Sequence, residues 1–419
     1  AAEAIELDLT ELPAVIDMKK AVADDSVKVH DDLTSNLCYD WGFVEENKAA
    51  VDEAFEKAAH VTTLELVNNR LVANPMEPRV AVGDYAAHND ESTLYTTSQN
   101  PHVIRLLMGA FVLGIPEHKL RVVAPDVGGG FGSKIFHYAE EAFCTFAAKQ
   151  LKRPVKWTST RSEAFMSDAH GRDHVTKIQL ALDADNNFTA LRTETYANMG
   201  AYLSTFAPSV PTWLHGTLMA GNYKTPLIYV NVKAVFTNTV PVDAYRGAGR
   251  PEAITLLERT MDMAARELGL SPFELRRRNF IPEAAFPYTT PGEMTYDVGS
   301  FARVLARAET LGEIDAYEAR RKASEAKGML RGLGLAYYIE SILGEDSEGA
   351  VIEFTDAGVK LYVGTQSNGQ EHETVYAQYL ADITGLPFDQ IEIVQGDSDL
   401  IGRGGGTGGS RSVTVQTTA

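Results

Sequence analysis

The sequence contains very little cysteine. Only Cys38 and Cys144 occur among 419 residues. Two thiols are too few for a disulfide framework, and an iron–sulfur cluster is normally held by about four cysteine thiolates. If this protein needs such a cluster, we expect it on another chain.

Long apolar runs are also missing. The most apolar stretch, residues 103–115, is short and contains Arg105, whereas a membrane-spanning helix needs about 20 apolar residues. The first residues lack a basic segment followed by an apolar core, which a secretory signal would have. We therefore expect a cytoplasmic protein without a membrane span.

Positive charge is in deficit. The chain has 38 Lys and Arg residues against 57 Asp and Glu residues, a formal net charge of -19. Such an acidic protein repels phosphate backbones and anionic lipid surfaces, so nucleic acid and membranes are poor partners. The acidity does not identify the true partner.

The remaining composition is that of a folded protein with more than one domain. Hydrophobic residues make up 44% of the chain, and its length exceeds the roughly 100–200 residues of a typical single domain. Segments with helical and strand periodicity alternate without a fixed repeat, which predicts an α+β fold with mixed sheets and helices. Ile5, Leu7 and Leu9 alternate like a short strand, and the proline-containing and charged residues 282–330 suggest a domain boundary.

Local patterns predict two hairpins and two helices. The hairpins turn at residues 183–187 and 356–358, between runs of alternating apolar residues. Apolar residues at helical spacing predict one helix over 139–151 and another over 254–268, the second ending at Gly269.

Residues 127–134, Val-Gly-Gly-Gly-Phe-Gly-Ser-Lys, are the first candidate site. They follow a predicted strand at 120–123 and precede the first predicted helix, an order that can cradle an anion on free N–H groups. A tight structural turn explains the glycines equally well. Phe131 is either a core plug or a wall for a planar ligand. The order Gly132-Ser133-Lys134 departs from the Gly-Lys-Ser/Thr of a P-loop, which disfavours a nucleotide triphosphate.

A second candidate is the loop of residues 244–252, just before the second helix. Arg246, flanked by small residues, could stabilise a developing negative charge in a pocket, or could simply pair with a carboxylate. Residues 364–374 form a third polar loop between a strand and a helix, suited to a heterocycle or pyrophosphate. The fourth, 402–412, is glycine-rich and could line a phosphate or be a flexible linker.

His170 and His174 invite a metal interpretation, which we disfavour. Zinc proteases of the helical type need two such histidines on one helix, whereas residues 175–182 have the alternation of a strand.

Together and in this order, the four candidate segments resemble the large, molybdopterin-binding subunit of the molybdenum hydroxylases, the family of xanthine dehydrogenases, aldehyde oxidases and aerobic carbon monoxide dehydrogenases. The resemblance covers nearly the whole chain. It implies that residues 1–25 end an upstream α/β hammerhead-like domain and that 26–290 form the first molybdenum-cofactor-binding domain. Residues 291–330 would connect it to the start of the second at 331–419, so the chain looks like a fragment.

The resemblance also implies roles for particular residues. Gln99, in Thr97-Ser98-Gln99, would lie near the apical oxo group of molybdenum, Phe131 would wall the substrate pocket, and Arg246 would stabilise charge on the substrate. No protein side chain is expected to ligate the metal directly. The residues implied to hold the cofactor are Gly129, Gly130, Phe131, Gly132, Arg246, Gly369, Gln370, Gly409, Ser410, Arg411 and Ser412.

The implied cofactor is molybdopterin, as the cytosine dinucleotide of prokaryotic members. The implied reaction hydroxylates an aldehyde or an N-heterocycle with oxygen from water. Electrons would pass to [2Fe–2S] clusters and FAD on a small and a medium partner subunit. The family's general-base glutamate is expected outside this sequence, in the remaining half of the molybdopterin-binding region, on missing sequence or a second polypeptide.

Two departures from the family's pattern narrow the range of expected substrates. Members that bind copper carry a cysteine in the active-site loop, where this chain has residues 247–249, Gly-Ala-Gly, so copper binding and CO oxidation are disfavoured. Xanthine-oxidising members have a glutamate where this chain has Ile135, which disfavours purines. The alternatives are a carbon monoxide dehydrogenase-like subunit without the copper-binding cysteine, a cofactor-free structural fragment, and a nucleotide-binding protein.

Overall fold

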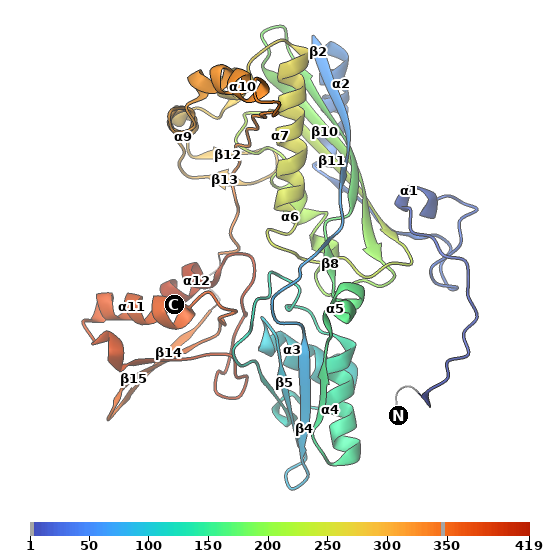
Figure 1. Ribbon diagram of the computed structural model, residues 1–419, viewed down its shortest axis with the longest axis vertical. Coiled ribbons are helices and arrows are strands. Elements are labelled where there is room, and N and C mark those ends of the chain that lie inside the picture. Colours follow the sequence, from blue (N-terminus) through green and yellow to red (C-terminus); the bar gives the residue numbers. More distant parts are fainter. Residues whose placement is uncertain (1–3, 345–347) are drawn as a thin grey trace.

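The computed structural model describes residues 4–344 and 348–419, and it has three sheets of three or more strands (Figure 1). The α+β class and the mixed sheets are confirmed. The largest sheet has five strands in the order β1 (Leu37–Phe43), β11 (Ile228–Phe236), β10 (Phe188–Gly200), β9 (His174–Leu182) and β2 (His60–Asn68). Only β10 and β11 pair in parallel, and the β9–β10 hairpin is the first of the two that the sequence predicts.

The two faces of this sheet bury different helices because side chains alternate along each strand. On β9, Ile178 and Leu180 belong to the main core together with α7 (Arg250–Glu267), whereas Ala181 faces the other side and packs with Val51 of α2 (Lys48–Lys57). Figure 1 shows α7, in yellow, running along the sheet. The predicted helix over 254–268 is therefore confirmed, and it begins four residues earlier.

The second sheet has the order β6 (Leu120–Val123), β5 (Glu91–Thr96), β4 (Val80–Ala86) and β7 (Val155–Thr158). Helix α4 (Ala139–Leu151) lies against it so closely that a Cβ on Gly83 would come within 2.3 Å of the Cys144 carbonyl oxygen. Glycine is required there because the helix and strand backbones are nearly in contact.

The third sheet is formed by β14 (Ala350–Thr355), β15 (Gly358–Val363) and β16 (Ile391–Val394), with α11 (His372–Thr384) and α12 (Ser412–Thr418) beside it. The β14–β15 hairpin is the second one predicted from the sequence.

The other paired strands are β3 (Leu71–Val72) with β8 (His170–Gly171), and β12 (Tyr288–Thr289) with β13 (Thr295–Tyr296). The other α-helices are α1 (Met18–Ala21), α3 (Pro101–Leu107), α5 (Arg161–Ser167), α6 (Trp213–Gly216), α8 (Pro272–Asn279), α9 (Phe301–Leu311) and α10 (Tyr317–Glu325). Short irregular helical turns lie at Glu45–Asn47, Met108–Leu113, Glu117–Lys119, Ala207–Ser209, Glu283–Ala285, Ile314–Ala316 and Phe388–Gln390.

One local expectation was wrong. Residues 5–9 form no strand with any described part of the chain, and Ile5, Leu7 and Leu9 are exposed because nothing packs on them. The segment 291–330, expected to connect two domains, contains α9 and α10, and Leu305 of α9 is fully buried in the main core. Within the described residues, no helix is both long and apolar enough to reach across a lipid bilayer.

Candidate active site

Five loops from distant parts of the sequence meet around one cavity of about 500 Å³. The loop of residues 124–138 follows β6, residues 97–100 follow β5, and residues 364–371 follow β15, so these three leave the carboxyl ends of their strands. The other two, residues 244–249 and 402–411, precede α7 and α12. The cavity thus lies where the second and third sheets and the start of α7 come together.

The glycine-rich loop at 128–132 is shaped by close contacts. A Cβ on Gly130 would lie 2.3 Å from Oε1 of Gln99, and one on Gly132, whose φ is +107°, would lie 2.4 Å from the Ala244 carbonyl oxygen. Oε1 of Gln99 also accepts a hydrogen bond from the Gly132 N–H at 2.9 Å. Phe131 has φ +56° and is 42% exposed, so its ring is presented to the cavity and is not a core plug.

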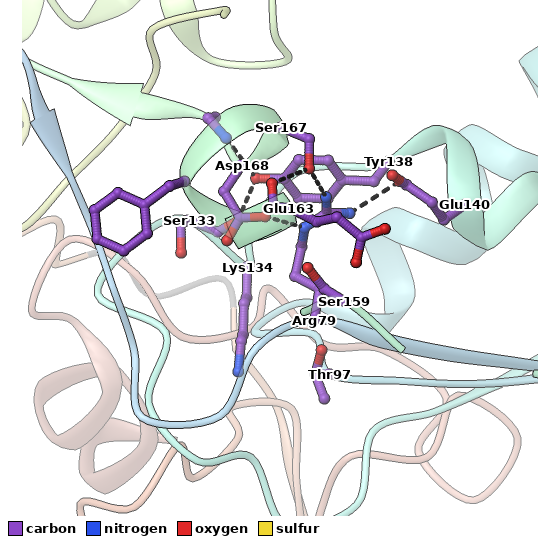
Figure 2. Close-up of polar contacts among 12 residues, drawn as sticks. Arg79, Thr97, Ser133, Lys134, Tyr138, Glu140, Ser159, Glu163, Ser167 and Asp168 are labelled. Atoms are coloured by element: carbon purple, nitrogen blue, oxygen red, sulfur yellow. Dashed lines mark hydrogen bonds and ion pairs between the residues drawn. The ribbon is translucent and has the colours of Figure 1, made fainter. Parts of the chain in front are cut away.

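A buried ionic cluster around Arg79 contacts the backbone that follows the glycine-rich loop (Figure 2). Nε of Arg79 donates to Asp168 at 2.6 Å and Nη1 donates to Glu140 at 3.0 Å. The guanidinium lies 3.6 Å from the centre of the Tyr138 ring, and the Tyr138 hydroxyl donates to the Ser133 carbonyl oxygen at 2.6 Å. The cluster therefore fixes the backbone directly after Gly132.

Lys134 is a second buried cation under the loop. Its side chain is fully buried, and Nζ donates to the backbone carbonyl and to the carboxylate of Glu77 at 2.8 and 3.0 Å. Burial lowers the pKa of Lys134 although Glu77 opposes that effect. The same carboxylate accepts from the Gly128 N–H at 2.7 Å, so the ion pair also holds the start of the loop. A lysine used in this way is not a phosphate ligand of the P-loop kind.

Arg246 is placed against Phe131 by both backbone and side chain. Its N–H donates to the Phe131 carbonyl oxygen at 2.8 Å, and its guanidinium carbon lies 4.7 Å from the centre of the Phe131 ring. Within the described part of the chain, the guanidinium makes no hydrogen bond or ion pair. The donors of Arg246 are therefore available to a ligand in the cavity.

The loop that carries Arg246 is held by Arg172, a residue that no sequence motif singles out. Its guanidinium donates to the carbonyl oxygens of Tyr245 and Arg246, both at 2.7 Å, and lies 3.3 Å from the carboxylate of Glu252. Both partners of this ion pair are buried, and burial raises the pKa of Glu252. Two successive peptide planes of the loop are thereby fixed.

The loops of the third sheet contribute free backbone donors. Gly409 and Ser410 have φ of +60° and +56°, and their N–H groups donate to no described residue. Consecutive N–H groups in such a turn form a concavity that suits an anion. Asn368, Gly369 and Gln370 line the same cavity from the opposite loop.

The structure brings most of the predicted site residues together, but not all. Those that line the cavity are Gln99, Gly130, Phe131, Gly132, Arg246, Gly369, Gln370, Gly409 and Ser410. Gly129, Arg411 and Ser412 do not. Arg411 is buried in an ion pair with Glu348 at 2.8 Å, and the Ser412 hydroxyl shares a hydrogen bond with that of Thr407.

The two histidines of the disfavoured metal site lie on consecutive strands that belong to different sheets. His170 is on β8 beside Arg70, and His174, on β9, packs edge-on against His215. No group of three or more metal-binding side chains occurs in the segments 4–344 and 348–419.

The donors around the cavity fit a pterin-type cofactor. Free N–H groups at residues 409–410 and a flat Phe131–Arg246 wall are the kinds of group that bind a polar, fused heterocycle with an anionic substituent. The Gln370 carboxamide is partly engaged, since Oε1 accepts from the Asn368 N–H at 2.6 Å and Nε2 lies 3.1 Å from Nε2 of His372, which leaves one N–H for a ligand. Gln99 fits less simply, because its amide is already engaged. Its Nε2 donates to the Thr407 carbonyl oxygen at 2.8 Å, which leaves one N–H for a ligand.

Sequence comparison identifies the family. Residues 29–280 match the molybdopterin cofactor-binding domain, and residues 308–419 match a second domain of the same description. The chain therefore belongs to the family of molybdopterin cofactor-binding domain proteins, and the resemblance seen in its motifs is confirmed.

Individual relatives agree with this assignment. The nicotine 6-hydroxylase large subunit of Paenarthrobacter nicotinovorans is 34% identical over 87% of this chain and 46% of its own length. The carbon monoxide dehydrogenase large chain of Hydrogenophaga pseudoflava is 32% identical over 99% of this chain and 55% of its own length. The crystal structure of quinoline 2-oxidoreductase from Pseudomonas putida 86 matches with a TM-score of 0.92 at 30% identity, covering 100% of this chain and 55% of that one. The chain spans about half the length of the curated relatives it matches.

Proposed function

We propose that this chain is the cofactor-binding part of a molybdenum hydroxylase that oxidises an aldehyde or an N-heterocycle. The observation that carries the proposal is the single cavity lined by Phe131, Arg246 and the loops of both cofactor-binding domains. In the overall reaction, a C–H bond of the substrate is replaced by a bond to oxygen from water, and two electrons and two protons are released. When bound, molybdopterin supplies the molybdenum centre for this two-electron oxidation.

The residues of this chain would bind the pterin and orient the substrate. Gly369, Gln370 and the N–H groups of Gly409 and Ser410 would hold the pterin, and the cytosine dinucleotide form is part of the proposal. The Phe131 ring would align a flat substrate. The free guanidinium of Arg246, kept in place by Arg172, would donate to the substrate atom on which negative charge develops.

The electrons require a relay beyond this chain. Relatives carry names such as large subunit, large chain and complex subunit gamma, so they belong to multi-subunit enzymes. We propose that a small subunit with [2Fe–2S] clusters and a medium subunit with FAD accept the electrons, and that the complex is cytoplasmic.

Metal and cofactor analysis tests the proposal. The chain is expressed with its partner subunits, and the purified complex is measured for molybdenum and extracted for the pterin dinucleotide. We expect near-stoichiometric molybdenum with a cytosine dinucleotide. An intact complex without molybdenum would contradict the proposal and favour a structural role for the chain.

A further inference from the structure

Beside the cavity of Phe131 and Arg246 lies a second, more apolar cavity of about 540 Å³. That size falls in the ~300–1,000 Å³ range of small-molecule sites. The two cavities share the wall residues Ile135, Ala244, Ala248, Arg250, Thr407, Gly408 and Gly409. The second is further lined by the apolar side chains of Phe206, Trp213, Leu214 and Leu343. These apolar side chains therefore lie directly beside the cavity that Arg246 and Phe131 line.

Apart from Oδ1 of Asn100, which has no hydrogen-bond partner among the described residues, the polar side chains that line the apolar cavity are engaged with the protein. The Ser209 hydroxyl donates to the backbone carbonyl oxygen of Phe206 at 2.8 Å, and the Thr407 hydroxyl donates to the backbone carbonyl oxygen of Gln366 at 2.6 Å. Arg411 is paired with Glu348. The walls thus offer few hydrogen bonds to a substituted polar ring such as a purine, and they favour an apolar aromatic body.

One carboxyl group faces this combined site. Among the described residues that line either cavity, Glu340 is the single acidic one. Its nearest charged partner is Arg250, with Nε 3.8 Å from the carboxylate, too far for a hydrogen bond. Within residues 4–344 and 348–419, Glu340 makes no side-chain hydrogen bond, and its side chain is 38% exposed to the cavity.

We propose that Glu340 is a substrate-binding residue, and that the substrate is an aromatic N-heterocycle with an apolar body whose ring nitrogen hydrogen-bonds to this carboxyl group. The inference rests on the proposed function and specifies its substrate class. A carboxyl group donates to an unprotonated ring nitrogen when it carries a proton and accepts from a protonated one when it does not. Burial raises the pKa of Glu340, which extends the pH range in which it can donate. An aldehyde offers only a carbonyl oxygen, which the Arg246 guanidinium already suits.

Arg250 gives Glu340 its position. The Arg250 side chain is 4% exposed, and its guanidinium also donates to the Gly247 carbonyl oxygen at 3.4 Å. A buried cation at this distance attracts the carboxylate without occupying its hydrogen-bonding positions. Glu340 thus presents a carboxyl group, and Arg246 a cationic hydrogen-bond donor, to the same cavity. This pair complements a ring with a basic nitrogen.

The test compares two flat molecules of the same shape, quinoline and naphthalene, which differ in one ring nitrogen. Binding to the assembled complex is followed by quenching of the fluorescence of Trp213, which is half exposed in the apolar cavity, and Trp213→Phe identifies its signal. We expect quinoline to bind about tenfold more tightly than naphthalene, the effect of one well-formed hydrogen bond from the protonated carboxyl group that naphthalene cannot accept. Glu340→Leu should abolish this preference, and Glu340→Gln, whose amide can still donate, should retain most of it. Glu325→Leu, on exposed α10, is the matched control.

A preference for quinoline that survives Glu340→Leu, or wild-type protein that binds both molecules equally, would overturn the inference. Turnover separates this result from the proposed function. If the complex holds molybdenum, Glu340→Leu should lower kcat/KM for quinoline by about tenfold or more, chiefly through KM, and change that for benzaldehyde less than twofold. Wild-type complex that oxidises benzaldehyde but not quinoline would refute the substrate class and leave the hydroxylase function standing. Complex without molybdenum would refute the function, and the binding preference would still decide the role of Glu340.

Discussion

The ion pair between Arg79 and Asp168 is expected to be a large determinant of stability at the glycine-rich loop. The two side chains are 6% and 1% exposed, and their atoms approach to 2.6 Å. Arg79→Met keeps the length of the side chain but leaves the Asp168 carboxylate buried without its partner. Removing one member of a buried pair costs about 3–5 kcal/mol, because the remaining charge has lost its solvation and its counterion.

A double variant tests whether the loss of stability comes from the unpaired Asp168 carboxylate. In Arg79→Met/Asp168→Asn no uncompensated carboxylate remains at that position, so the double variant should be more stable than Arg79→Met alone. We expect a coupling free energy of at least about 1 kcal/mol, within the ~0.5–3 kcal/mol seen for residues in contact. The exposed pair of Arg278 and Glu274 supplies the control, since Arg278→Met should cost only about 0–1 kcal/mol.

Urea unfolding followed by the fluorescence of Trp157 measures these effects locally, because the Arg79 guanidinium lies 5.1 Å from that ring. The reasoning would be refuted if Arg79→Met cost less than about 1 kcal/mol, or if adding Asp168→Asn made it no more stable. Because Tyr138 stacks on Arg79 and holds the Ser133 carbonyl oxygen, we also expect Arg79→Met to reduce the molybdenum content of the assembled complex.

Three further predictions concern the loops and the core. Gly130→Ala should lower the molybdenum content, because its Cβ would come within 2.3 Å of a side-chain oxygen, whereas Gly332→Ala, with open space around it, should not. Arg172→Met should lower kcat with whichever substrate the complex oxidises, while molybdenum content changes little; equal loss of both would show a general folding defect instead. Burial lowers the pKa of His174 to about 3 and that of His215 to about 4, against about 6.5 unfolded, so their contribution to stability is complete above pH 6.5 and is lost as the pH falls toward those values. Lowering the pH to 5 should therefore reduce the free energy of unfolding by about 2 kcal/mol for each histidine. Urea unfolding at pH 7 and pH 5 should show that His215→Leu loses about 2 kcal/mol less than the wild-type protein between these two pH values.

Sequence reasoning worked best where the signal is local. The turn at residues 183–187, the helix at 139–151 and the glycine loop between a strand and a helix are each specified by neighbouring residues, and the structure contains all three. The strand expected at residues 5–9 failed because alternation shows only that a strand could form, whereas its formation needs a partner. The sequence did not predict the helices within 291–330, because the prolines and charged residues of that segment are typical of a connection, yet Phe301 and Leu305 of α9 both contact the main core.

The contacts that position the site could not be predicted, because they join residues far apart in the sequence. Arg79 and Asp168 are 89 residues apart, and Arg172 and Arg246 are 74 apart. Neither pair leaves a pattern that a window of neighbouring residues would reveal. Arg411, expected from the resemblance among the cofactor-binding residues, shows the same limit, because its ion pair with Glu348 joins residues 63 apart.

Gln99 explains why the cavity depends on both cofactor-binding domains at once. Its backbone N–H donates to the Lys134 carbonyl oxygen at 2.8 Å, and its own carbonyl accepts from the Thr407 N–H at 2.9 Å. Its side chain repeats the connection, with Oε1 bonded to Gly132 and Nε2 to Thr407. One residue therefore ties the glycine loop of the first domain to the terminal loop of the second through five hydrogen bonds, the fifth from the Lys134 N–H to Oε1 at 3.4 Å. A ligand that contacts both loops binds only the docked arrangement, so it must stabilise that docking by mass action.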